Sequence, residues 1–314
     1  MVLGVFGYAL PMAQQLGRGE PFGSPSPVPT KTEGSGGPDS PLDLSSSDWK
    51  ATAKRVMKEF KQDRVAMVAA SLAFYFFLAI FPALIAAVGI VGLMGLGPQL
   101  LDSLNQSIGT TIPGGAGEIL TAVIESAQKA SKGTSVMAAI IGISIALWSA
   151  TAGMNALQQG LDVAYDVPTE RQRPFFKARA VALLLVVTTG VLAAIPSPFF
   201  AAKGVVWSVL GWIVTVVAVI TLLAIYYYLG PNRDKPNWKW VSPGGVIGTI
   251  LFLMASGAFS VYVGNFAKYG ETYGPLASVV VLLFWLYLSG MAIMLGGEWN
   301  AELERQTAMR EGRV

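Results

Sequence analysis

The sequence predicts an all-α, multi-pass membrane protein with six transmembrane helices and both termini in the cytoplasm. Three observations support this prediction. Of the 314 residues, 53% are hydrophobic and only 13% are charged, whereas soluble domains carry roughly 25% charged residues. Six long stretches contain no Asp, Glu, Lys or Arg. The Lys and Arg residues gather in alternate connections between these stretches.

The charge-free stretches are long enough to cross a bilayer, because a transmembrane helix needs about 20 apolar residues. Moving a charged side chain to the bilayer centre costs roughly 2.5–3.5 kcal/mol, which explains why the charges are absent. The six predicted spans cover residues 67–94, 135–158, 179–201, 205–229, 244–264 and 276–297.

The distribution of Lys and Arg predicts the orientation. With alternate connections on opposite sides, 18 of the 22 basic residues fall on the side that holds both termini. Only Lys129, Lys132, Lys203 and Lys268 fall on the other side. Because cytoplasmic loops carry the excess of Lys and Arg, both termini are expected in the cytoplasm.

The segments outside the spans have different compositions. Residues 1–47 are expected to form a disordered cytoplasmic tail, since 19 of the 31 residues at 17–47 are Gly, Pro or Ser. Residues 48–64 predict a basic amphipathic helix, capped by Asp48, that lies on the anionic cytoplasmic leaflet. Its apolar stripe is Trp49, Ala53, Val56 and Phe60.

Within the six-helix membrane domain at 65–301, residues 95–134 predict an external helical hairpin. Residues 302–314 are expected to form a cytoplasmic C-terminal tail.

The absence of Cys and His restricts the chemistry. It excludes disulfides, thiolate nucleophiles, Cys/His zinc sites and every Ser-His-Asp mechanism. A nuclease would need a metal-bound carboxylate cluster or a site based on Lys and Tyr. For the first, Asp162 and Asp166 could bind Mg²⁺ with Asp63 or Glu298. The favoured interpretation is that these are loop residues paired with Arg171, Arg173 and Lys177. We expect no catalytic residues, cofactor, metal site or nucleic-acid partner.

A transporter needs a polar path through the bilayer, and the spans hold several neutral candidates together with one acidic residue at a span end. Pro82 frees a backbone carbonyl in the first span. The candidate path consists of Ser71, Tyr75, Pro82, Asn155, Gln158, Tyr262, Tyr287 and Glu298, with Asn265 and Ser289 as further neutral groups. The alternative is that these side chains form hydrogen bonds between helices. For Glu298, beside Gly296 and Gly297, a salt bridge with Arg64 at the cytoplasmic end is expected.

Blocks of residues in fixed order carry a family resemblance over residues 49–301. They are Ala69–Tyr75, Phe81-Pro82, Trp148–Ala150 with Asn155, Leu161–Tyr165, Tyr227–Asn232, Trp238–Gly244, Phe259 with Tyr262, Tyr273-Gly274, Trp285–Tyr287 and Gly296–Ala301. In these blocks the chain resembles the YihY/BrkB family of bacterial inner-membrane proteins, formerly labelled ribonuclease BN-like. It departs from the family pattern at Asp162, where Asn is usual, and at Gly297, where Ala is usual.

The resemblance implies a six-helix protein of the cytoplasmic membrane without an agreed biochemical activity. Members have been linked to serum resistance and named as a ribonuclease, and transport has been suggested for some. Together with the polar candidates, this favours a non-enzymatic protein that moves a small solute or ion. The alternative is a membrane scaffold that binds partners through the hairpin at 95–134, and the third hypothesis is a metal-dependent ribonuclease.

Overall fold

The computed structural model describes residues 44–93, 121–122, 124–125, 136–202, 204–233, 238–265 and 275–310. Most of the predicted N-terminal tail and nearly all of the predicted hairpin at 95–134 lie outside these ranges; Ser46 and Ser47, which were assigned to the tail, are helical. Within them the regular elements are helices. They are α2 (Ser46–Gln62), α3 (Val65–Leu93), α6 (Val136–Ala164), the 3-10 helix η3 (Thr169–Arg171), α7 (Phe175–Ala194), α8 (Ser197–Ala201), α9 (Val205–Leu229), α10 (Trp238–Asn265) and α12 (Pro275–Arg310).

Six helical segments in the described part of the chain are long and apolar enough to cross a membrane. They correspond to the six predicted spans, so the predicted all-α, six-span fold is confirmed. Five of them are single helices, while the span at 175–200 combines α7 and α8. The break between α7 and α8 falls at Pro196, and Pro198 follows at the start of α8. Proline lacks the backbone donor that a continuous helix would need there.

Several helices run further than the predicted spans: α10 begins at Trp238 instead of residue 244, and α7 at Phe175 instead of residue 179. α6 continues past residue 158 to Ala164, and α12 continues past residue 297 to Arg310. Residues 302–310, which we assigned from the sequence to a C-terminal tail, are therefore helical. A helix is not obliged to end where its lipid-compatible part ends, because charged residues outside the hydrocarbon can continue it when they pack against other elements.

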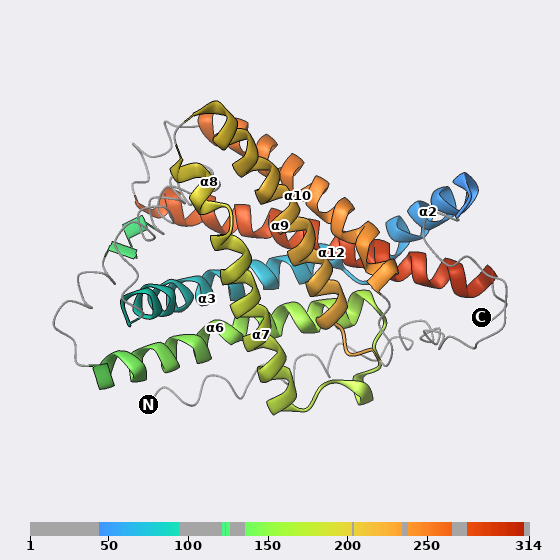
Figure 1. Ribbon diagram of the computed structural model, residues 1–314. Coiled ribbons are helices and arrows are strands. Elements are labelled where there is room, and N and C mark those ends of the chain that lie inside the picture. Colours follow the sequence, from blue (N-terminus) through green and yellow to red (C-terminus); the bar gives the residue numbers. More distant parts are fainter. Residues whose placement is uncertain are drawn as a thin grey trace.

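α12 is the helix around which the others are arranged (Figure 1). It contacts α2, α3, α6, α9 and α10. The main buried cluster combines side chains of five helices: it includes Leu72 of α3, Leu161 of α6, Leu185 of α7, Tyr227 of α9 and Met294 of α12. α2 and the C-terminal part of α12 lie side by side at one end of the bundle (Figure 1). We call this end, which also includes the α2–α3 turn and the C-terminal ends of α6 and α9, the α2 end.

The amphipathic helix predicted at 48–64 is present as α2, and it begins earlier than expected. Ser45 is the N-cap, and Asp48 occupies the third helical position of a capping box instead of the cap itself. Trp49 and Phe60 of the predicted apolar stripe pack against the protein, Trp49 beside Trp299 of α12. The basic side chains Lys50, Lys54, Lys58 and Lys61 are exposed.

Close backbone contact between α10 and α12 depends on glycine. A Cβ atom built on Gly244 would overlap the Gly296 carbonyl oxygen and the Asn300 side chain. A Cβ atom on Gly296 would overlap the Tyr227 hydroxyl group and lie 2.8 Å from the Gly244 carbonyl oxygen. The Gly244 amide also donates to Asn300 Oδ1 at 2.7 Å. Gly296 thus provides the close approach of a neighbouring backbone that the sequence suggested, whereas Gly297 faces side chains of α6 and α9.

Replacing Gly244 with Ala is expected to destabilise the protein by about 1–3 kcal/mol, because the added methyl group meets atoms of α12 that cannot move independently. The measurement is the thermal midpoint and the yield of folded protein in detergent. Gly257→Ala in the same helix is the matched control, since nothing lies within 4 Å of a Cβ atom there. Equal stability of the two variants would show that the α10–α12 contact is not as close as described.

Candidate functional site: a buried carboxyl pair

Glu298 of α12 is a deeply buried carboxyl group, and no Lys or Arg side chain forms an ion pair with it among the described residues. Its side chain is 1% exposed, and Oε1 has no hydrogen-bond partner in the part of the chain that the structure describes. The Glu298 carboxyl group lies beside the Asp63 carboxyl group. Because an ionised carboxylate can only accept, two such groups can hydrogen-bond to each other only when one of them carries a proton. We call Asp63 and Glu298 the carboxyl pair.

The turn between α2 and α3 brings Asp63 to Glu298. Asp63 follows the last residue of α2, and its amide donates to the Glu59 carbonyl at 2.8 Å. Arg64 then adopts a left-handed conformation with φ 50°, which non-glycine residues rarely adopt. The expected Glu298–Arg64 salt bridge is wrong, because this turn directs Asp63 toward Glu298 and leaves Arg64 exposed.

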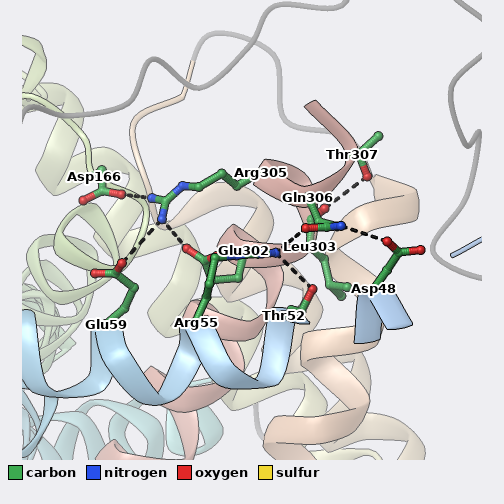
Figure 2. Close-up of polar contacts among 10 residues, drawn as sticks. All are labelled: Asp48, Thr52, Arg55, Glu59, Asp166, Glu302, Leu303, Arg305, Gln306 and Thr307. Carbon is green, nitrogen blue, oxygen red and sulfur yellow. Dashed lines mark hydrogen bonds and ion pairs between the residues drawn. The ribbon is translucent and has the colours of Figure 1, made fainter. Parts of the chain in front are cut away.

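Further charged groups surround the carboxyl pair. Arg305 of α12 lies between three acidic side chains: Glu59 at 3.8 Å, Asp166, and Glu302 on its own helix (Figure 2). Asp166 follows the end of α6 and has φ 49°, a left-handed conformation that is common just after helix ends. One guanidinium group therefore joins α2, α6 and α12 next to the carboxyl pair.

The surroundings favour the protonated form of Asp63. Burial raises the pKa of Asp63 to about 6, and the nearby Asp166 and Glu59 carboxylates add to the increase, while the hydrogen bond from Glu298 and the charge of Arg305 oppose it. Burial likewise raises the pKa of Glu59, against the lowering effect of Arg305. The pair therefore holds a proton near neutral pH more readily than free carboxyl groups would.

A second network fixes α2 to the end of α12. Arg55 Nε donates to Glu302 Oε2 at 2.6 Å, and Arg55 Nη2 donates to Gln306 Oε1 at 2.6 Å. Gln306 in turn donates to Asp48 at 2.8 Å (Figure 2). Sequence reasoning missed this network because it assigned residues 302–314 to a tail. The signal was present in the spacing of Glu298, Glu302 and Arg305, which falls on one face of a helix.

Gln158, a predicted path residue, belongs to a different polar group at the α2 end. Its amide donates to the Ala178 carbonyl at 3.1 Å and its Oε1 accepts from Arg173 at 2.9 Å. Arg173 also donates to the carbonyl groups of Leu229, Gly230 and Pro231, which satisfies the C-terminal end of α9. Burial lowers the pKa of Arg173. Gln158 thus positions a capping arginine.

The other predicted path residues occupy varied positions. Ser71, Tyr75 and Tyr262 are exposed on the outside of the bundle, and the Ser71 hydroxyl donates to the Val68 carbonyl. Pro82, Asn155 and Tyr287 are partly buried in α3, α6 and α12. Ser289 is buried and donates to the Trp285 carbonyl at 2.8 Å, while the side chain of Asn265 lies outside the description. Of the predicted residues, Glu298 alone combines deep burial with an unsatisfied polar atom in the described structure.

The four carboxylates proposed for a magnesium site do not all meet. Asp166 lies near Asp63 and Glu298, but Asp162 accepts from the Asn232 amide at 2.8 Å and lies near Arg173. The described residues contain no group of three or more acidic side chains arranged to hold a metal ion. The prediction that these are loop residues paired with Arg171, Arg173 and Lys177 is therefore only partly reproduced: Asp162 lies near Arg173 but within α6, and Asp166 pairs with Arg305.

Six apolar helices that enclose a buried carboxyl pair at one end define an integral, multi-pass membrane protein. The chain belongs to the family described as Virulence factor BrkB, whose family model matches residues 56–313. This confirms the resemblance found in the sequence blocks.

Curated relatives cover most of the chain. A Bacillus subtilis protein named "Putative ribonuclease-like protein YfkH" is 33% identical over 254 residues, which are 76% of this chain and 89% of the relative. An Aeromonas salmonicida protein named "UPF0761 membrane protein" is 26% identical over 261 residues, 79% of this chain and 87% of the relative. No solved structure matches this chain.

The raised pKa of Asp63 predicts a pH-dependent stability. The folded state keeps the Asp63 proton up to about pH 6, whereas an unfolded chain releases it near the ordinary value of 3.8. This stabilisation is therefore complete below the ordinary pKa and is lost as the pH rises through the folded pKa of about 6. The thermal midpoint of the wild type should fall over this range and then level off. Asp63→Asn should remove this part of the decrease, and an unchanged pH profile in that variant would contradict the pKa assignment.

Removing the Arg55 side chain is expected to loosen α2. Arg55→Ala deletes two charge-assisted hydrogen bonds to α12, each typically contributing about 1.5–3 kcal/mol when buried, although Arg55 is partly exposed and the loss will be smaller. Amide hydrogen exchange along α2 should accelerate while exchange in α9 stays unchanged. Lys54→Ala, at the neighbouring exposed position, is the control. Equal protection of α2 in both variants would show that Arg55 does not hold it.

Proposed function

We propose that this protein moves a small solute or ion across the inner membrane, with both termini in the cytoplasm. The observation that carries the proposal is Glu298, an acidic side chain that is 1% exposed and retains an oxygen without a partner in the described structure. Buried polar groups are normally satisfied because an unpaired one costs free energy. Such groups in membrane proteins frequently belong to ion or proton pathways.

The position of the carboxyl pair supports this function. Glu298 lies where α12 meets α2, α3 and α6, so any movement of these helices relative to one another changes its surroundings. Asp63 is only partly buried at the α2–α3 turn and links Glu298 to the aqueous side. Tyr287 and Asn155, partly buried on α12 and α6, are the neutral groups that we propose to continue the path.

The charge distribution supports the proposed orientation. The α2 end contains Arg55, Arg173, Arg233 and Arg305, and most of the basic residues of the chain lie in segments that join this end. We propose that the exposed lysines of α2 face the anionic cytoplasmic leaflet, at about 1 kcal/mol for each basic side chain near the surface. The apolar stripe of α2 is used largely against α12, so this contact depends mainly on charge.

The acidic side chains near Arg305 support a non-enzymatic protein better than they support a metal-dependent nuclease. The nuclease hypothesis requires a divalent cation among the acidic side chains. Arg305 already contacts Glu59, Asp166 and Glu302, and its guanidinium group supplies the positive charge that a metal ion would supply. The word "ribonuclease" in the name of the Bacillus relative is a statement about that protein.

The experiment records currents from proteoliposomes on a sensor surface while amino acids, sugars, nucleosides and inorganic ions are added in turn. Wild-type protein is expected to give a current or a labelled uptake with at least one of these probes, and Glu298→Gln is expected to reduce it several-fold. Glu170→Gln, at an exposed position of η3, is the matched control. Absence of movement with every probe, or equal rates in wild type and Glu298→Gln, would overturn the proposal.

A further inference from the structure

We propose that Asp63 and Glu298 form a proton-binding site, and that the bound proton is the ion coupled to solute movement; the second part rests on the proposed function. The proposal names the ligand of the buried carboxyl pair. It starts from the burial of Glu298, which is 1% exposed, from its Oε1 atom, which has no partner in the described structure, and from the position of Asp63 beside it.

The contact between the two carboxyl groups favours at least one bound proton. Two ionised carboxylates in contact would repel each other and would have no donor between them. Glu298 cannot turn to water, because it is 1% exposed. In this proposal the pair shares a proton, because removal of that proton would leave two like charges in a poorly solvated position.

The described groups around the pair supply no uncommitted positive charge that could replace this proton. Those that face it are Glu59 from α2, Asp166 and Tyr165 from the end of α6, and Glu302 and Arg305 from α12. Arg305 is the only cation in this described set, and it is already in contact with Glu59, Asp166 and Glu302. Tyr227 of α9 also lies in the buried cluster, but its hydroxyl donates to the Ile293 carbonyl at 2.8 Å. No uncommitted positive charge among these groups is available to neutralise a second carboxylate of the pair.

The two members of the pair have different access to water. Asp63 is partly exposed at the turn between α2 and α3, whereas Glu298 is enclosed by the helices. A proton that arrives from the aqueous side therefore reaches Asp63 first and passes to Glu298 along their hydrogen bond. The proton moves between carboxyl oxygens without any change in bonds to carbon, so the step needs no further reactant.

The test is infrared difference spectroscopy of the full-length protein in lipid while the pH is raised from about 5 to about 8. Part of the carbonyl stretch of the protonated carboxyl groups should be lost with a midpoint near the pKa of Asp63, about 6, and the proton that the pair retains should preserve the rest. The band should be absent from the Asp63→Asn/Glu298→Gln double variant and unchanged in Glu170→Gln. Absence of the band in the wild type, or its survival in the double variant, would overturn the proton site. A spectral change driven by sodium at constant pH would also overturn it.

Transport measurements separate this inference from the proposed function. With a proton gradient imposed across proteoliposomes, wild-type uptake of the active probe should increase several-fold, and Glu298→Gln should not respond to the gradient. Uptake that ignores the gradient would refute proton coupling and leave transport intact. A titrating band in a protein that moves none of the probes would refute transport while the proton site stands.

Discussion

The guanidinium group of Arg305 is the contact on which the arrangement of the α2 end depends. It lies between acidic side chains of α2, of the segment after α6, and of α12 itself. Without it, Glu59, Asp166 and Glu302 would repel one another across a partly buried space where charges are poorly screened. The carboxyl pair lies beside this cluster, and Arg305, the cation that acts on Asp63, is already shared among Glu59, Asp166 and Glu302.

The membrane-spanning parts satisfy their polar side chains mostly within the same helix. The hydroxyl groups of Ser144, Thr188, Thr215 and Thr221 all donate to the carbonyl four residues earlier. This is the local solution for a hydroxyl group in an environment without water. Many of the polar contacts between helices gather at the α2 end, where Arg173 caps α9 and Arg233 binds Glu304. The spans are thus held by close packing, and the α2 end is held by charge.

The fold was predictable from the sequence because lipid imposes a simple rule on composition. Absence of charge located all six spans, and most of their ends differ by few residues from the helices observed. The rule stops working where the hydrocarbon stops, so it could not show that α12 continues to Arg310. That extension depends on contacts with α2, such as Arg55 with Glu302, which join residues far apart in the sequence.

The candidate site was predictable only in part. Glu298 stood out because an acidic residue follows two glycines at the end of a span. Its partner could not be chosen, since Asp63 and Arg64 are adjacent in sequence and opposite in charge. The left-handed conformation of Arg64 decides which of them faces α12, and residue type alone does not predict that conformation. The neutral candidates were chosen by depth in the span, which does not tell the inside of a bundle from its outside.

The unbroken length of α12 has a mechanical consequence. Its 36 residues extend about 54 Å at 1.5 Å per residue, whereas the hydrocarbon layer is about 30 Å thick. The helix therefore acts as a rigid rod with a long arm outside the bilayer, and α2 is attached to that arm through Arg55 and Arg305. A small change of tilt within the lipid becomes a larger displacement of α2 at the water interface. A rearrangement of α12 deep in the membrane consequently also changes the position of α2 at the water interface.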